Sequence, residues 1–117
     1  MKRYIRSAVD NYLDKDMGYR AMVADHTSSQ REIALLAKDP EEFVRACIAS
    51  NPYTSEELLT ELAKDPAVRV RMHVAKNPHT PVSSLNKLRE SDSYDIVRDY
   101  ALNTLAVLDL RRHHAST

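Results

Sequence analysis

The sequence predicts an all-α protein, a short α-solenoid of about four helix-pair repeats with roughly eight helices. The first observation is a phrase that recurs at an offset of 26 residues, from Asn51 to Asn77. Residues 29–52 read SQREIALLAKDPEEFVRACIASNP, and residues 55–78 read SEELLTELAKDPAVRVRMHVAKNP. A fixed period of this length is typical of stacked-repeat proteins. The second observation is that the chain has only 1 Gly and that its 5 Pro lie between periodic segments, which favours helices joined by short turns.

We interpret the whole chain as one domain, because 117 residues suffice for one modest core but not for two. The N-terminal unit is degenerate, as expected for a terminal repeat with one face in water. The predicted boundaries of the single α-solenoid domain, residues 1–117, are a cap repeat at 1–26, repeats at 27–52, 53–78 and 79–105, and a C-terminal helix end and tail at 106–117.

Each repeat carries start and stop signals for two helices. Ser29 with Glu32 is typical of a capping box before a first helix. Asp39 is expected to be the N-cap of the second helix, with Pro40 at its first position. The same devices recur as Thr54 with Glu57, Asp65 with Pro66, and Thr80 with Pro81.

The last helix is expected to be longer than the others. The Asn-Pro pair that closes the two preceding repeats is absent from the third, so no stop signal is present. The pattern predicts a helix from about Tyr94 toward Arg111, with basic residues near its negative end.

Composition excludes several classes of function. The 17 basic and 17 acidic residues give a net charge of zero, so no global field attracts nucleic acid or an anionic membrane. The single Gly18 cannot form a Gly-rich phosphate loop, and no nucleophile elbow or paired-carboxylate motif is present, so we expect no enzyme. The 5 His show no ligand spacing, and Cys47 alone forms neither a disulfide nor a thiolate site, so we expect no metal and no cofactor. Without a membrane-length apolar run, the default localisation is cytoplasmic.

Four Asp–Arg pairs share a spacing of six residues. An Asp at the start of a helix accepts hydrogen bonds from backbone amides, and an Arg further along can bind the Asp of its own or of the adjacent unit bidentately. The pattern therefore predicts a structural ladder of ion pairs. The alternative is a row of arginines that contact phosphates. The residues are Asp14 and Arg20, Asp39 and Arg45, Asp65 and Arg71, and Asp92 and Arg98.

Three recurring motifs carry a family resemblance: LAKDP at 36–40 and 62–66, VR at 44–45 and 70–71, and NP at 51–52 and 77–78. Residues 27–105 resemble the leucine-rich repeat variant (LRV) family and, more broadly, the HEAT-like helical repeats. The resemblance implies a right-handed solenoid with an Asp and Arg ladder. The segments 41–50 and 67–76 look long enough for true α-helices, which favours HEAT-like geometry. The cysteine cluster of the family's iron–sulfur member has no counterpart here.

Second helices of such stacks tend to line one broad concave face, the usual interaction surface. Its expected outward columns are Ala21, Ala46, Met72 and Asp99, and Asp25, Ser50, Lys76 and Asn103; a loop column holds Thr27, Tyr53 and His79. None is uniformly basic or acidic, so the face suits a protein partner. The candidate partner-binding residues are Tyr53, Met72, Lys76, His79, Asp99 and Asn103.

Three hypotheses for function follow. The first is a non-enzymatic protein–protein interaction adaptor that uses the concave face of the second helices. The second is nucleic-acid binding through the Arg row and the basic termini, which predicts affinity that falls steeply with salt. The third is a structural protein that self-associates through exposed repeat ends.

Overall fold

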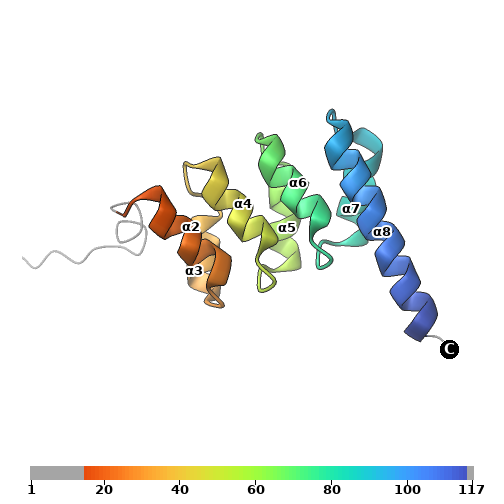
Figure 1. The fold of residues 1–117 in the computed structure, drawn as a ribbon, viewed down its shortest axis with the longest axis horizontal. Coiled ribbons are helices and arrows are strands. Elements are labelled where there is room, and N and C mark those ends of the chain that lie inside the picture. The colour runs from red at the N-terminus through yellow and green to blue at the C-terminus, as the bar shows by residue number, and fades with distance from the viewer. Residues whose placement is uncertain (1–14, 116–117) are drawn as a thin grey trace, which may run out of the picture.

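The computed structural model describes residues 15–115 and is all-α, as the sequence predicts. This range holds seven helices and no strand (Figure 1). Asp14 and the helix expected near the start of the chain lie outside the described residues. The helices are α2 (Met17–His26), α3 (Gln30–Leu36), α4 (Glu42–Ser50), α5 (Glu56–Leu62), α6 (Val68–Lys76), α7 (Val82–Ser91) and α8 (Asp95–Ala115).

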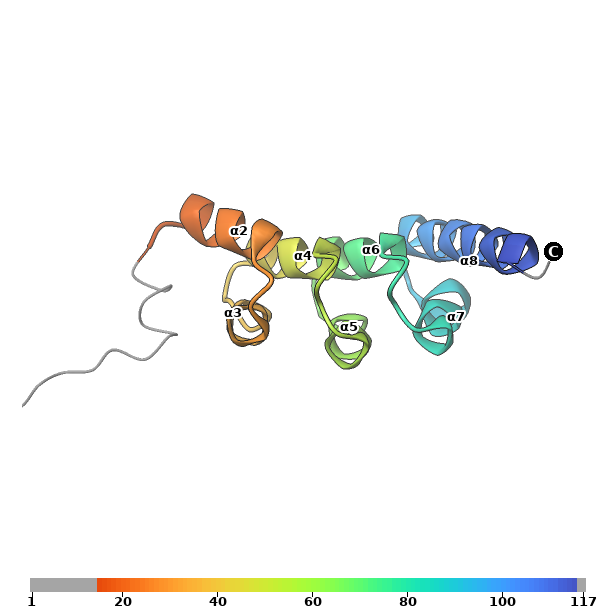
Figure 2. The same ribbon diagram turned by 90° about the horizontal axis from the view of Figure 1, so that it is seen from below.

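The helices form two rows (Figure 2). In the even row, α2 packs on α4, α4 on α6, and α6 on α8. In the odd row, α3, α5 and α7 each pack beneath the even helix that follows them in the chain, and Figure 2 shows them standing apart from one another. The even row is therefore the continuous one.

The core lies between the two rows, and equivalent residues of successive units occupy equivalent buried positions. Leu36, Leu62 and Leu88 of the odd helices are all buried. The inward positions of the even helices hold Val44, Val70 and Val97, and then Ile48, Val74 and Ala101. Burial of such aliphatic side chains stabilises the fold by roughly 1.5–3 kcal/mol each.

The expectation that Asp39 and its equivalents are helix N-caps is wrong. Helix α4 has Glu41 as its N-cap and α6 has Ala67, and neither cap makes a side-chain hydrogen bond. The Asp39 carboxylate instead accepts a hydrogen bond from the N–H of Glu41 at 3.0 Å. This bond spans two residues and forms a turn just before α4. The reason is that the same carboxylate is held by an Arg of the preceding unit.

Two of the expected capping threonines are also not caps. Ser55, not Thr54, caps α5 by accepting from the N–H of Leu58. Thr54 and Thr80 are buried, and their hydroxyls donate to the carbonyls of Ile48 and Val74 at the ends of the preceding helices. Pro81 takes the cap position of α7. A buried hydroxyl needs a hydrogen-bond partner, and a carbonyl near the C-terminal end of a helix is available as an acceptor.

The first helix of the 27–52 repeat begins as predicted, with Ser29 as the N-cap of α3. The reciprocal half of the capping box is different, because the Glu32 carboxylate accepts from the Thr27 hydroxyl and not from the Ser29 N–H. At the other end of the chain, α8 is the longest helix, with 21 residues, and it extends past the rest of the even row (Figure 1).

Candidate partner-binding surface

A ladder of ion pairs fixes the spacing of the even helices. The sequence left open which unit supplies the Asp, and in the structure Arg20, Arg45 and Arg71 each bind the Asp of the following unit. The Nε atoms of Arg20, Arg45 and Arg71 lie 2.8, 2.8 and 2.7 Å from the Oδ2 atoms of Asp39, Asp65 and Asp92. In each pair Nη2 donates to the second carboxylate oxygen, so the contact is bidentate.

The same guanidinium groups also hold their own unit. Nη1 of Arg45 donates to the backbone carbonyl of Asp39 at 2.8 Å, and Nη1 of Arg71 donates to that of Asp65 at 2.8 Å. The hydrogen bond to the paired Asp is the main cause that raises the pKa of Arg20, Arg45 and Arg71. These three guanidinium groups therefore stay charged and bonded to their Asp carboxylates.

A second row of bonds joins the even helices at their C-terminal ends. The amide of Asn51 donates to the carbonyls of Ala24 and Thr27, both at 2.8 Å. Asn77 donates to the carbonyl of Ala49 at 2.8 Å. The sequence identified Asn51 and Asn77 only as residues that end a helix before Pro. Their bonds to the preceding unit depend on the packing of two helices and have no local signal.

The outer face of the even row differs from the face expected from the sequence. Ala21 and Ala46 are buried, so their assignment to an outward column is wrong. Both belong to the cluster of buried apolar residues that forms the core. The exposed face instead carries Met22, which is 53% exposed, together with Phe43 and Ile96. The 3.6-residue period that placed Lys76 outward also places these positions outward.

Two adjoining hollows lie on this face along α6. The first, about 270 Å³, is lined by Val68, Arg69, Met72, His73 and Ile96. The second, about 340 Å³, is lined by Ser50, Pro52, His73, Lys76, Asn77, Pro78 and His79. His73 lines both, and its Nδ1 lies 2.7 Å from the Ser50 hydroxyl. The sequence did not single out His73 as a surface residue.

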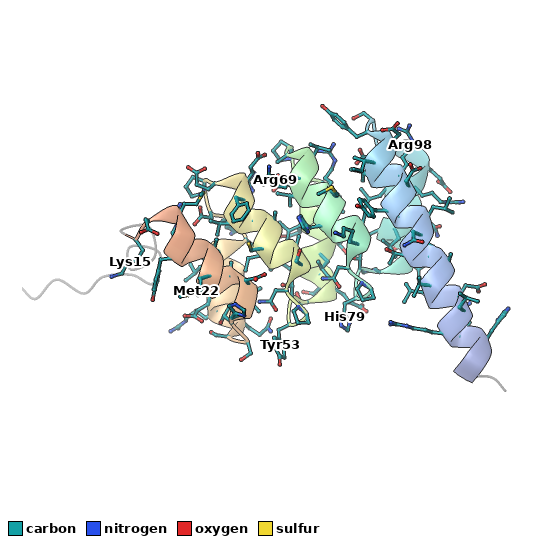
Figure 3. The ribbon with its side chains drawn as sticks, in the orientation of Figure 1. Lys15, Met22, Tyr53, Arg69, His79 and Arg98 are labelled. Carbon is teal, nitrogen blue, oxygen red and sulfur yellow. The ribbon has the colours of Figure 1, made fainter. Side chains whose placement is uncertain are left out.

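The structure brings some of the candidate residues together and separates others. Lys76 and His79 line the same hollow, and half-buried Met72 lines the adjoining one. Tyr53 lines neither hollow; it is 57% exposed, and Figure 3 shows it on the same edge of the molecule as His79. Asp99 and Asn103 are exposed on α8 and line neither hollow.

Helix α6 supplies the positive charge of the face. The Arg69 guanidinium lies over the Phe43 ring, 5.7 Å from its centroid, and the Lys76 ammonium lies over the Tyr100 ring at 5.1 Å. These cation–π contacts hold the cations beside apolar surface. Burial lowers the pKa of His73, with Lys76 and Arg69 acting in the same direction and Asp25 in the opposite one. Burial also raises the pKa of the Cys47 thiol.

No group of three or more His, Cys, Asp or Glu side chains with the proximity to hold a metal ion occurs within residues 15–113. None of the seven described helices combines the length and the apolar character needed to cross a bilayer. No family model, no curated protein and no solved structure matches the chain.

Proposed function

We propose that the protein is a non-enzymatic helical-repeat module that binds a protein partner on the outer face of α2, α4, α6 and α8. In this proposal the chain is a short right-handed α-solenoid related to the LRV and HEAT-like repeats. The observation that carries the proposal is the pair of adjoining hollows along α6, which are lined by exposed Ile96, half-buried Met72 and the cations of Arg69 and Lys76. Exposed Phe43 lies beneath the Arg69 guanidinium. Apolar anchors with a charged rim are typical of partner-binding surfaces.

The spacing of the two rows supports the choice of this face. Even helices pack side by side, whereas odd helices stand apart (Figure 2). In a curved stack the row with the closer spacing is the inner one, so the even row is the concave side of the proposed solenoid. Concave faces are the usual binding surfaces of such stacks.

Nucleic-acid binding through the Arg row is the weaker alternative. The Nε and Nη2 donors of Arg20, Arg45 and Arg71 are already bonded to carboxylates, so a phosphate would have to displace an Asp from each. The formal net charge of zero supplies no long-range attraction to offset that cost.

The test is affinity capture with the purified chain as bait, using two charge-matched double variants. Arg69→Glu with Lys76→Glu reverses the exposed charges of α6. Arg31→Glu with Lys38→Glu makes the same change in charge on exposed residues at the odd row. We expect loss of partner recovery from the first variant and unchanged recovery from the second, with helical circular dichroism retained in both.

Equal recovery by both variants would remove the α6 face from consideration. Equal loss in both would point to a charge-driven contact that is not confined to this face, and the proposal would then be abandoned.

A further inference from the structure

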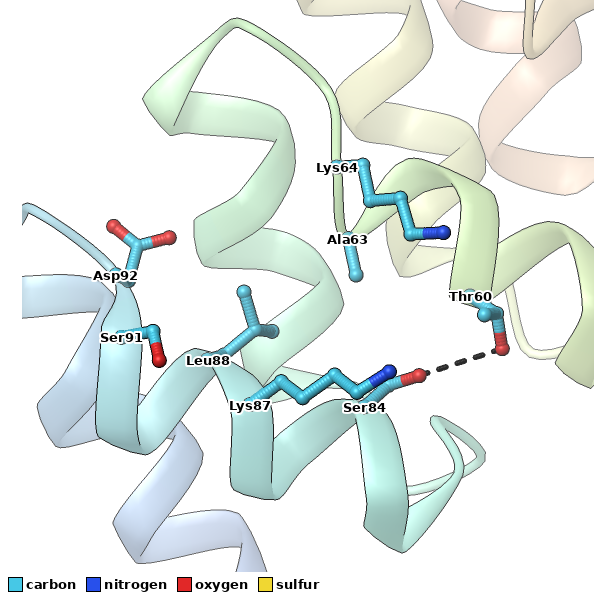
Figure 4. A pocket seen from close by; sticks show the side chains of 8 residues that line it. All are labelled: Thr60, Ala63, Lys64, Ser84, Lys87, Leu88, Ser91 and Asp92. Atoms are coloured by element: carbon cyan, nitrogen blue, oxygen red, sulfur yellow. Dashed lines mark hydrogen bonds between the residues drawn. The ribbon is translucent and has the colours of Figure 1, made fainter.

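A cleft of mixed polar and apolar lining separates α5 from α7 on the odd side of the molecule, away from the even-row face (Figure 4). Its volume is about 210 Å³. Ala63 and Leu88 supply apolar lining, and three hydroxyls and two lysines supply the polar part. The lining residues are Thr60, Ala63, Lys64, Ser84, Lys87, Leu88, Ser91 and Asp92.

The sequence repeat provides an internal reference for this cleft, because α3 and α5 stand in the same relation as α5 and α7. At the offset of 26 residues, Ser84 corresponds to Leu58 and Thr60 corresponds to Ala34. Leu58 packs against the core, whereas Ser84 places a hydroxyl at the equivalent position. The α5–α7 cleft is therefore the one in which hydroxyls replace apolar side chains.

The two helix pairs also differ in charge. The α3–α5 pair has Lys38 and Glu61 at the positions that correspond to Lys64 and Lys87 of the α5–α7 pair, so a pair of opposite charges is replaced by two cations. Neither Lys64 nor Lys87 makes an ion pair within the described residues. Figure 4 shows both side chains extending toward the end of the cleft where Thr60 and Ser84 meet.

The one carboxylate that lines the cleft is already neutralised. Asp92 Oδ2 lies 2.7 Å from Nε of Arg71, and Oδ1 accepts from Nη2 of Arg71 and from the N–H of Tyr94. Its charge therefore does not balance the two lysines. The cleft as a whole presents an excess of positive charge beside hydroxyl groups.

The hydroxyls have the capacity to bind an acceptor. Thr60 donates its proton to the carbonyl of Glu56 at 2.9 Å, so it is not a donor to a ligand. Ser84 is buried, and its hydroxyl donates to the Thr60 oxygen at 3.4 Å, the long limit for such a bond. A better acceptor in the cleft would therefore take the Ser84 proton. Ser91 adds a second hydroxyl donor on α7.

We propose that the α5–α7 cleft binds a phosphate group, as a monoester or as the free anion, with Lys64 and Lys87 as counter-charges and Ser84 and Ser91 as hydrogen-bond donors. A phosphomonoester carries a charge of about −1.5 to −2 at neutral pH and three acceptor oxygens, which matches two cations and two hydroxyls better than a carboxylate does. Lysine binds phosphate as a point charge, without a fixed fork geometry.

The experiment is isothermal titration calorimetry of the full chain at low salt with inorganic phosphate, with O-phosphoserine in a short peptide, and with acetate. We expect saturable binding of both phosphates and no saturable binding of acetate. Tighter binding of the peptide than of inorganic phosphate would identify a phosphorylated side chain as the source of the group. Equal affinity would identify the free anion, and both results support the site.

Two variants introduce the residues that stand at the equivalent positions of the α3–α5 pair, and they are therefore expected to fold. Ser84→Leu fills the cavity, and Lys87→Glu recreates an opposite charge pair; each is expected to weaken phosphate binding by about tenfold or more. The matched control is Lys38→Gln, which removes the equivalent cation of the α3–α5 pair and is expected to leave phosphate binding unchanged.

The absence of saturable phosphate binding by the wild-type chain, or an equal loss in the Lys38→Gln control, would overturn the proposal. Because none of these residues lies on the even-row face, either result leaves the proposed protein-binding function as it stands.

Discussion

The interior units and the last unit contain the same arginine but give it different surroundings. Arg20, Arg45 and Arg71 each bind the carboxylate of the following unit. Arg98 pairs with no carboxylate among the described residues, and the one bond it makes there is from Nη1 to the backbone carbonyl of Asp92. The bond to its own unit is therefore common to interior and terminal arginines, whereas the ion pair depends on the neighbouring unit.

A second position also differs between the last unit and the preceding ones. Ala24, Ala49 and Ala75 lie fully buried on the side of each even helix that the next helix covers, and their carbonyls accept from Asn51, Asn77 and Thr104. The corresponding residue of α8 is Leu102, which is 52% exposed. The last unit therefore exposes a large apolar side chain at a position where the three preceding units bury an alanine.

The largest effect is expected from removing the most buried carboxylate of the ladder. In Asp39→Ala, the Arg20 guanidinium keeps its charge but loses its partner, and the side chains of this pair are 9% and 1% exposed. Breaking a buried ion pair from one side costs about 3–5 kcal/mol. Urea unfolding followed by circular dichroism should show this loss, with Asp99→Ala as the exposed control. A loss below about 1 kcal/mol would mean that the ladder contributes little to stability.

The next effect concerns the bonds at the C-terminal ends of the even helices. Asn51→Ala removes donors to Ala24 and Thr27 and the acceptor of the Tyr53 N–H. We expect a loss of about 2 kcal/mol in the free energy of unfolding, because buried carbonyls lose their partner. Asn77→Ala should cost less, since Asn77 makes one bond fewer. The reverse order in chemical denaturation would contradict this reading of the two amides.

A smaller effect is expected at the end of the ladder. Arg98→Ala should change the free energy of unfolding by less than about 1 kcal/mol, because no carboxylate is left unpaired. Arg45→Ala is the matched interior variant and should cost several times more, since it leaves Asp65 without its guanidinium. Equal losses in thermal or urea unfolding would show that the interior and terminal arginines do not differ in role.

The smallest effect is a pH dependence that comes from His73. Its pKa is lowered in the folded protein, so the unfolded chain binds the proton more readily as the pH falls. The contribution of neutral His73 is therefore complete above the ordinary pKa of about 6.5 and is lost below it. His73→Gln should flatten the dependence of stability on pH below about pH 6.5. An unchanged profile, with exposed His79→Gln as the control, would assign the pH dependence to other groups.

The sequence anticipated features that depend on one helix or on one repeat. The all-α class follows from apolar periodicity and from the placement of the 5 Pro. The N-cap at Ser29 follows from a local pattern. The N-cap predictions for Asp39, Thr54 and Thr80 were wrong for one reason. Each side chain bonds to an element other than the helix that it was expected to cap.

The outer face was harder to predict because a column of residues does not reveal how close the next helix comes. Ala46 and Lys76 both lie off the inward stripe of an even helix, yet Ala46 is buried in the apolar core and Lys76 is exposed. The hollows on α6 and the cleft between α5 and α7 likewise depend on distances between helices.

The sequence by itself determined the period and the helical class, because both follow from the recurring motifs and from local start and stop signals. Only the tertiary structure decided which Asp each Arg binds, which carbonyls the Asn side chains reach, and where the surface is hollow. Those contacts join residues about twenty or more positions apart, and their geometry is set by the packing of the even row.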